Sequence, residues 1–226
     1  MLSFPLLLTI YAGFIHAFEA DHLLAVSNIV SQRSNMKSSM KDGIFWGLGH
    51  SSTIFLIGLL MIIFKVGISA HSFHYFEALV GVMLITLAIY RLLKFFRNKN
   101  ITVHVHPHSH GEGAHKHLHV HSDGQHSHQH THSLAYGVGL VHGLAGSGAL
   151  ILIVLAQIKT PIDGLVYLLI FSMGSVAGMF LAAGLFSVPF SKRIMQAKSL
   201  QTVLIVITSS LCFVYGARVI YENLIA

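Results

Sequence analysis

The stretch G13-F-I-H-A-F-E-A-D-H-L-L-A-V26 places two imidazoles and two carboxylates, His16, Glu19, Asp21 and His22, within an otherwise apolar segment. Each ionised carboxylate near the centre of a bilayer costs about 2.5 to 3.5 kcal/mol on insertion scales, so two would cost about 5 to 7 kcal/mol. Protonation, a buried water pathway or a bound cation must compensate this cost. A divalent metal with two carboxylates and neutral imidazoles has no net charge, so a metal is the simplest compensation.

The geometry of this segment favours a break in its helix. On a regular helix His16, Glu19 and His22 share one face and Asp21 points away. Either Asp21 has another role, or the helix unwinds near residues 16 to 22 so that all four groups converge. Residues 2 to 30 would also measure about 43 Å as one helix, beyond the ~30 Å hydrocarbon core. We therefore expect an interrupted helix, and the alternative is a satisfied cluster of polar core residues.

The composition identifies a membrane protein. Of the 226 residues, 54% are hydrophobic and 10% are charged, and the mean hydropathy is +0.69. About a quarter of the residues in soluble domains are charged. The net charge of +6 does not indicate nucleic acid, because Lys and Arg flank the apolar segments. A single cysteine, Cys212, excludes an intrachain disulfide and a cysteine-built metal site. We interpret the N-terminal segment as a retained span rather than a signal peptide.

The apolar segments predict an all-α membrane protein with six transmembrane helices. Their approximate bounds are residues 2–30, 43–65, 75–97, 133–158, 162–188 and 199–224. Eleven of the fourteen basic residues follow spans one, three and five. The positive-inside rule therefore predicts a multi-pass protein of the cell (inner or plasma) membrane, with both termini outside and the long third loop in the cytoplasm.

The chain also repeats itself. Residues 13–26 align with G139-L-V-H-G-L-A-G-S-G-A-L-I-L152 at a constant offset, which pairs Gly13 with Gly139 and His16 with His142. A unit of three spans crosses the membrane an odd number of times, so a second copy must be inverted. This predicts a 3+3 inverted repeat, as in many transporters, with the substrate site near the midplane. The predicted units are a first repeat at 1–97 that carries the metal site, a cytoplasmic loop at 98–132 and a second repeat at 133–226.

A second polar motif opens the next span. In G47-L-G-H-S-S-T53 the glycines permit close helix approach, while His50 and three hydroxyls give the helix a polar face. Next to the first cluster, His50 is a candidate ligand or pathway residue. A structural histidine is the alternative. The sequence leaves open whether His142, His71 and His74 take part.

These residues resemble a known family, the nickel/cobalt transporters. H16-A-F-E-A-D-H22, followed by L23-L-A-V-S-N28, is similar to the family's H-x4-D-H signature, and L48-G-H-S-S-T53 is similar to its second signature. The resemblance implies that His16, Asp21 and His22 bind metal and that His50 assists. Uptake-type members commonly have Asp at the position of Glu19, an extra leading span and an acidic third signature. Six spans and a histidine-rich loop are closer to the nickel/cobalt exporter branch and to urease-accessory-type membrane permeases.

The third loop carries a histidine tract in three blocks that repeat every eleven residues. Alternation places the four imidazoles of a block on one side of an extended chain, where they would bind metal with low specificity. Intervening Gly, Pro, Ser and Asp predict a disordered loop. The alternative is a solvated expansion without function. The tract contains His104, His106, His108, His110, His115, His117, His119, His121, His126, His128, His130 and His132.

Together these features predict a permease for a divalent transition metal, Ni²⁺ or Co²⁺, with Zn²⁺ as a further substrate. The ion is substrate, and no prosthetic group and no enzyme activity are expected. Expected partners are the lipid bilayer, the metal ion and a cytoplasmic metallochaperone, and not nucleic acid. The alternatives are a haem-binding membrane redox protein and a membrane-tethered metal store or sensor. The sequence does not indicate an oligomeric state.

Overall fold

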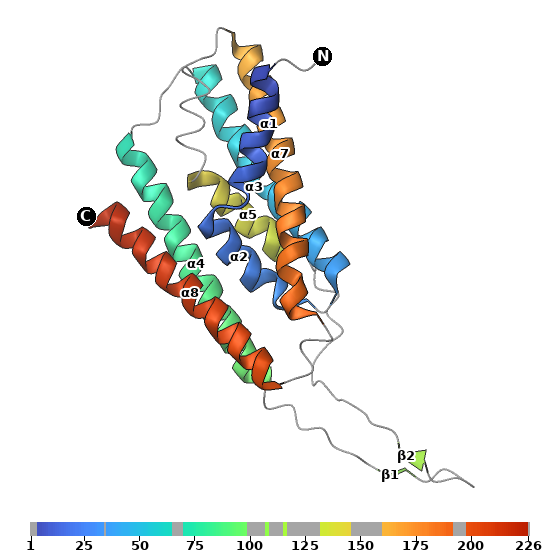
Figure 1. Cartoon of the computed structure of the whole chain (residues 1–226). Helices are drawn as coiled ribbons and strands as arrows, with labels where there is room; N and C mark the ends of the chain where they lie inside the picture. The colour runs from blue at the N-terminus through green and yellow to red at the C-terminus, as the bar shows by residue number, and fades with distance from the viewer. Residues whose placement is uncertain are drawn as a thin grey trace.

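The computed structural model is built almost entirely of helices (Figure 1). It describes residues 4–33, 35–64, 70–98, 107–108, 115–116, 132–145, 160–191 and 198–225. Within these ranges the only strands are β1 (Pro107–His108) and β2 (His115–Lys116), a two-residue antiparallel pair in the histidine tract. The prediction of a disordered loop otherwise falls outside the described residues.

The first apolar segment is interrupted, as its length and polar content predicted. Helix α1 (Phe4–His16) ends at the first histidine, and α2 (Ala20–Val30) begins four residues later. Glu19 separates them with an extended backbone, φ −65° and ψ 155°, and its side chain makes no capping hydrogen bond. The break therefore brings the C-terminus of one short helix and the N-terminus of another to the same place as the polar motif.

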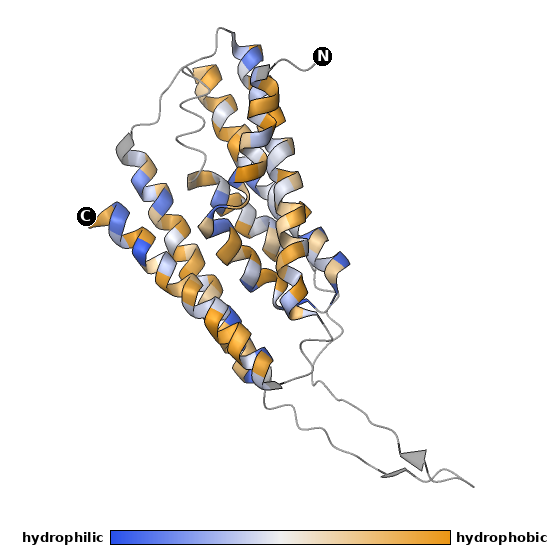
Figure 2. Cartoon of the chain, viewed as in Figure 1, coloured by the Kyte–Doolittle hydropathy of each residue, from blue (hydrophilic) through white to orange (hydrophobic). Residues whose placement is uncertain are grey.

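Four helices are long and apolar enough to cross a membrane, which makes the chain a multi-pass membrane protein. They are α3 (Met36–Phe64), α4 (Ala70–Asn98), α7 (Pro161–Ser187, continued by the 3-10 turn η1, Val188–Phe190) and α8 (Lys198–Leu224). Figure 2 shows apolar residues along most of their length. α1 and α5 (Ser133–Ala145) are shorter apolar helices, and residues 146–159 of the predicted fourth span lie outside the described residues. The count of six spans stays a prediction.

The helices pack in pairs around the short segments. α3 packs against both α7 and α5, α1 packs against α7, and α4 packs along α8. In Figure 1 α2 and α5 lie between the α4–α8 pair and the remaining helices. Glycines allow the closest approaches: a Cβ at Gly13 would collide with the backbone carbonyl of Phe171, and one at Gly139 would collide with that of Trp46. The two glycines that the sequence alignment pairs thus have equivalent roles at two helix crossings.

The helix ends follow the offset of the sequence repeat. α3 ends at Phe64 and η1 at Phe190, while α4 ends at Asn98 and α8 at Leu224. Both pairs of ends are 126 residues apart, the same offset that aligns Gly13 with Gly139. α3 and α7 run in opposite directions in Figure 1, as do α4 and α8. This correspondence is what an inverted repeat requires, and the 3+3 arrangement itself remains a prediction.

Candidate metal centre

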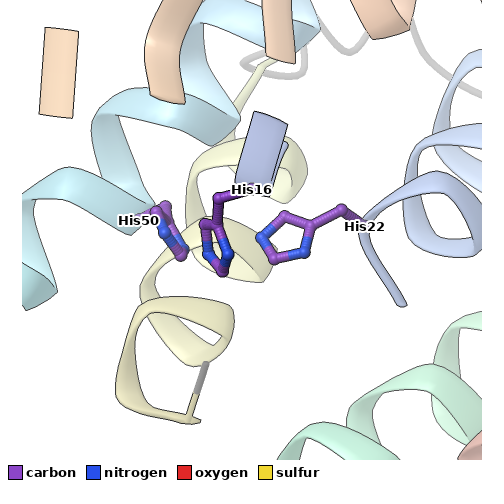
Figure 3. A group of neighbouring side chains, drawn as sticks. All are labelled: His16, His22 and His50. Carbon is purple, nitrogen blue, oxygen red and sulfur yellow. The ribbon is translucent and has the colours of Figure 1, made fainter. Parts of the chain in front are cut away.

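Three imidazoles converge at the break between α1 and α2. His16 is the last residue of α1, His22 lies in the first turns of α2, and His50 lies in the middle of α3. Figure 3 shows the ring of His16 between those of His50 and His22. The ring centroids are 4.6 Å apart for His16 and His22, 5.2 Å for His16 and His50, and 5.3 Å for His22 and His50. We call these three residues the histidine cluster.

The cluster is closed to solvent. The exposed fractions of His16, His22 and His50 are 3%, 0% and 0%. The ring of Phe171 packs against that of His16, with 5.6 Å between the ring centroids. Trp46 lies one helical turn before His50, and its ring packs against that of His22 with 5.4 Å between the centroids. Any charge placed among these rings is therefore shielded from water by aromatic walls.

A carboxylate lies next to one ring nitrogen in two of the imidazoles, and it makes a hydrogen bond in one of them. Nδ1 of His22 lies 2.9 Å from Oδ1 of Asp21, and Nδ1 of His16 lies 2.9 Å from Oε1 of Glu19, although the latter contact lacks hydrogen-bond geometry. Histidines that bind metals usually donate their second ring N–H to a carboxylate, which fixes the tautomer and leaves the other nitrogen as the ligand. Asp21 gives His22 this arrangement, and Glu19 is placed to do the same for His16.

The opposite nitrogens have no partner among the residues that the structure describes. Within these residues, Nε2 of His16, Nε2 of His22 and both ring nitrogens of His50 are buried without a hydrogen bond. Native proteins rarely leave buried polar atoms unsatisfied, and an ion is one of the few explanations for several in one place. One ligand atom from each of the three residues lies within 4.8 Å of the others. Opposite nitrogens on one ion are ~4 Å apart, so small side-chain rotations would close the site.

A second group of ligand atoms adjoins the cluster and shares His22. Oδ2 of Asp21 accepts a hydrogen bond from Nε2 of His142 at 3.1 Å, and the His22 and His142 rings stack at 4.3 Å. Asp21, His22 and His142 each offer one atom, all within 4.8 Å of one another. His142 is fully buried, and its Nδ1 has no hydrogen-bond partner within the described part of the chain. We call these three residues the bridging group.

The predicted site residues thus fall in three environments. His16, His22 and His50 form the cluster, and Asp21 reaches it through His22. Glu19 belongs to neither group of ligand atoms, and its side chain is 55% exposed. All four residues of the first motif nevertheless lie at the helix break. On a regular helix Asp21 would point away from the histidines, and the break allows its side chain to contact His22.

The structure adds residues that sequence reasoning left open or missed. The sequence leaves open whether His142 belongs to the metal site. Its alignment with His16 in the repeat is the sequence feature that could have identified it. Trp46 was missed, although its position four residues before His50 puts it on the same face of α3. Nδ1 of His74 donates to Oδ1 of Asn223 at 2.8 Å, away from both ligand groups, and the side chain of His71 lies outside the described residues.

The last histidine of the tract has a definite contact. Nδ1 of His132 lies 2.7 Å from Oδ1 of Asp42, and its ring stacks on Phe45 at 4.9 Å. Asp42 is 1% exposed and also accepts from the guanidinium of Arg33 at 2.9 Å. His132 therefore anchors the end of the tract to α3. The side chains of the other tract histidines lie outside the described residues.

Comparisons with known proteins agree with a membrane protein of this kind. The family model described as cytochrome C biogenesis protein transmembrane region matches residues 13–217. The chain belongs to this family of multi-pass membrane proteins. It is also 33% identical over 210 residues to the urease accessory protein UreH of Bacillus sp. (strain TB-90). The aligned residues cover 93% of this chain and 87% of that protein. No solved structure matches the chain.

Proposed function

We propose that the protein is a permease for a divalent transition-metal cation, Ni²⁺ or Co²⁺, and that the ion binds at the histidine cluster. The observation that carries the proposal is the convergence of three buried imidazoles from three helical segments with unpartnered nitrogens. Imidazole nitrogen is a ligand suited to Ni²⁺, Co²⁺ and Zn²⁺. A bound cation would satisfy one nitrogen of each imidazole, which no group among the described residues does.

Charge supports the same assignment. Asp21 and Glu19 are the acidic side chains at the helix break, and both contact cluster histidines. A divalent ion among neutral imidazoles would balance these two carboxylates, so the loaded site would be neutral overall. Filling the site would thus remove the insertion cost that the sequence predicts for two buried acids. Glu19 and Asp21 act in this scheme through the imidazoles that they hold.

The fold and the relatives support transport. A substrate site at the break of a discontinuous helix, flanked by helices whose ends repeat at a fixed offset, is the plan of many secondary transporters. The similarity to a urease accessory protein fits the resemblance to nickel/cobalt transporters, a group with urease-accessory-type permeases. In the proposed cycle the two repeats move around the cluster, and an ion gradient or the membrane potential drives net flux.

A redox function is the second candidate, because the matching family is described by cytochrome c biogenesis. The geometry opposes haem ligation by the cluster: ring separations of 4.6 to 5.3 Å among three imidazoles leave no space for a porphyrin between any two. The single cysteine, Cys212, also precludes a dithiol within this chain. The carboxylate contacts of His16 and His22 favour metal binding over haem binding.

The test is a flux assay in proteoliposomes with Ni²⁺, Co²⁺, Zn²⁺ and Mg²⁺, run in both directions. We expect saturable flux of the imidazole-binding ions and none of Mg²⁺, which prefers oxygen ligands. His22→Ala should abolish this flux while leaving the protein inserted, since His22 belongs to both ligand groups. His104→Ala, a single histidine of the tract, is the matched control and should retain saturating flux. Equal flux through His22→Ala and the unmutated protein would refute the site.

A further inference from the structure

A cavity of about 460 Å³ lies beside the helix break, between α2, α4, α5 and α8. Its lining includes Glu19, Asp21, Glu77 and Glu222, together with Tyr215 and Asn223. The whole chain has eight acidic residues, so half of them line this one cavity. A second cavity, of about 760 Å³ between α3 and α7, is lined mainly by apolar residues and no charged ones. Four acidic residues therefore gather around this cavity, and one of them, Glu222, is paired with Arg218 at 2.7 Å.

The cavity reaches the histidine cluster through two carboxylates. Asp21 lines the cavity and contacts both His22 and His142, and Glu19 lines it and contacts His16. The side chain of Asp21 is 19% exposed, whereas His22 and His142 behind it are fully buried. Nε2 of His22 and Nδ1 of His142 also lack partners among the described residues, so the bridging group offers buried, unsatisfied nitrogens next to the cavity wall.

The cavity lies at the end of the bundle opposite the histidine tract. Glu77 is in the first turns of α4, whose other end leads to the tract, and Glu222 is in the last turns of α8. Figure 2 shows hydrophilic residues at these two helix ends, near the C-terminus. His132 and Asp42 mark the tract side of the bundle. The acidic cavity and the anchored end of the histidine tract therefore lie toward opposite ends of the bundle.

We propose that the acidic cavity is the mouth through which the divalent cation reaches or leaves the histidine cluster, with Asp21, His22 and His142 as the intermediate binding site. This inference rests on the proposed function. Carboxylates at a narrow mouth raise the local concentration of cations and speed their capture. The ion then moves from the bridging group to the cluster, and His22 is the residue that both groups share.

The first test removes charge from the mouth without touching either ligand group. Glu77→Gln should lower Ni²⁺ flux at limiting metal by about two- to fivefold, and Glu77→Lys should lower it by about tenfold. Equilibrium Ni²⁺ binding to the purified protein should change by less than twofold in both variants. Asp163→Asn is the matched control, because Asp163 is an exposed acidic residue at the start of α7, at the same end of the bundle as Glu77, and does not line the cavity. Flux at limiting metal that is unchanged in Glu77→Lys would overturn the proposal.

The second test remains informative if Glu77 variants fold poorly. Val219 lines the cavity, whereas Val214 on the same helix is 64% exposed on the outer surface. Val219→Cys and Val214→Cys proteins are modified in detergent with thiol reagents of opposite charge and then reconstituted. The native Cys212 is fully buried, and the unsubstituted protein controls for its reaction. The cationic reagent should lower flux through Val219→Cys at least threefold more than the anionic one. Equal effects of the two charges there would overturn the proposal, as would the same difference at Val214→Cys.

The two proposals fail in different ways. If His22→Ala transports Ni²⁺ as well as the unmutated protein does, the proposed function is wrong. If His22→Ala abolishes flux while the Glu77 and Val219 variants match their controls, the cluster stands and the ion uses another route. Both results come from the same reconstituted vesicles, so they are directly comparable.

Discussion

Replacing Asp21 with asparagine should weaken Ni²⁺ binding by about ten- to a hundredfold, or about 1.4 to 2.8 kcal/mol. The carboxylate of Asp21 contacts Nδ1 of His22 at 2.9 Å and Nε2 of His142 at 3.1 Å, and it also accepts from the backbone N–H of His22 at 2.8 Å. Asparagine has one acceptor oxygen and no charge. It can satisfy one imidazole N–H, and its amide nitrogen would then face the other imidazole.

The magnitude follows from the kind of contact that is lost. Removing a carboxylate that holds a ligating histidine typically costs this range in metal affinity, because the tautomer and ring orientation are no longer fixed. Loss of a direct ligand would cost more, so Asp21→Asn should bind more weakly than the unmutated protein and more tightly than His22→Ala. This ordering distinguishes a residue that positions an imidazole from one that ligates the ion.

The assay is isothermal titration with Ni²⁺ on protein in lipid nanodiscs. Residues 104–131 are deleted in all samples so that the tract does not contribute binding, and His132 is kept because it contacts Asp42. Asp163→Asn makes the same chemical change at an exposed site and should leave the Kd unchanged. A Kd for Asp21→Asn within twofold of the unmutated value would refute the reasoning.

Three further predictions concern packing, the tract and the Asp42 contacts. Gly139→Ala should lower the free energy of unfolding by about 1 to 3 kcal/mol, because its Cβ would collide with the backbone of α3. Gly137→Ala should have no such effect, because the space around Gly137 is open. Thermal unfolding of both variants is followed by circular dichroism. Replacing residues 104–131 with a short Gly/Ser linker should remove several bound ions and leave saturating flux within about twofold. The helices should stay folded, because the free energy of loop closure changes by only ~0.6 kcal/mol per doubling of loop length. Loss of saturating flux with intact helices would show that the tract is an obligatory metal carrier. Asp42→Asn should lower the free energy of unfolding by about 3 to 5 kcal/mol, because the guanidinium of Arg33 loses the charge of its buried partner. A Tm equal to that of the unmutated protein would contradict this.

The sequence predicted the break in the first helix because the cost of buried charge and the length of the apolar segment both demanded it. It also predicted that His50 would approach the first motif, from glycines that permit close helix packing. It could not predict which groups contact which. Whether Asp21 ligates an ion or holds an imidazole depends on how far the chain unwinds between His16 and Ala20, and no local pattern encodes that geometry.

The acidic cavity could not be predicted from the sequence, for a different reason. Glu77 and Glu222 are 145 residues apart on α4 and α8, and only the packing of these two helices brings them to the same mouth. His142 illustrates an intermediate case. Its alignment with His16 marked it as a candidate, but its contact with Asp21 depends on α5 ending beside α2.

The most direct test of the central claim is X-ray absorption at the nickel edge on Ni²⁺-loaded protein that lacks residues 104–131. We expect one ion per chain with three imidazole ligands, and the imidazole signal should diminish in each of His16→Ala, His22→Ala and His50→Ala. A nickel environment with no imidazole, or one that is unchanged in all three variants, would exclude the histidine cluster as the metal site.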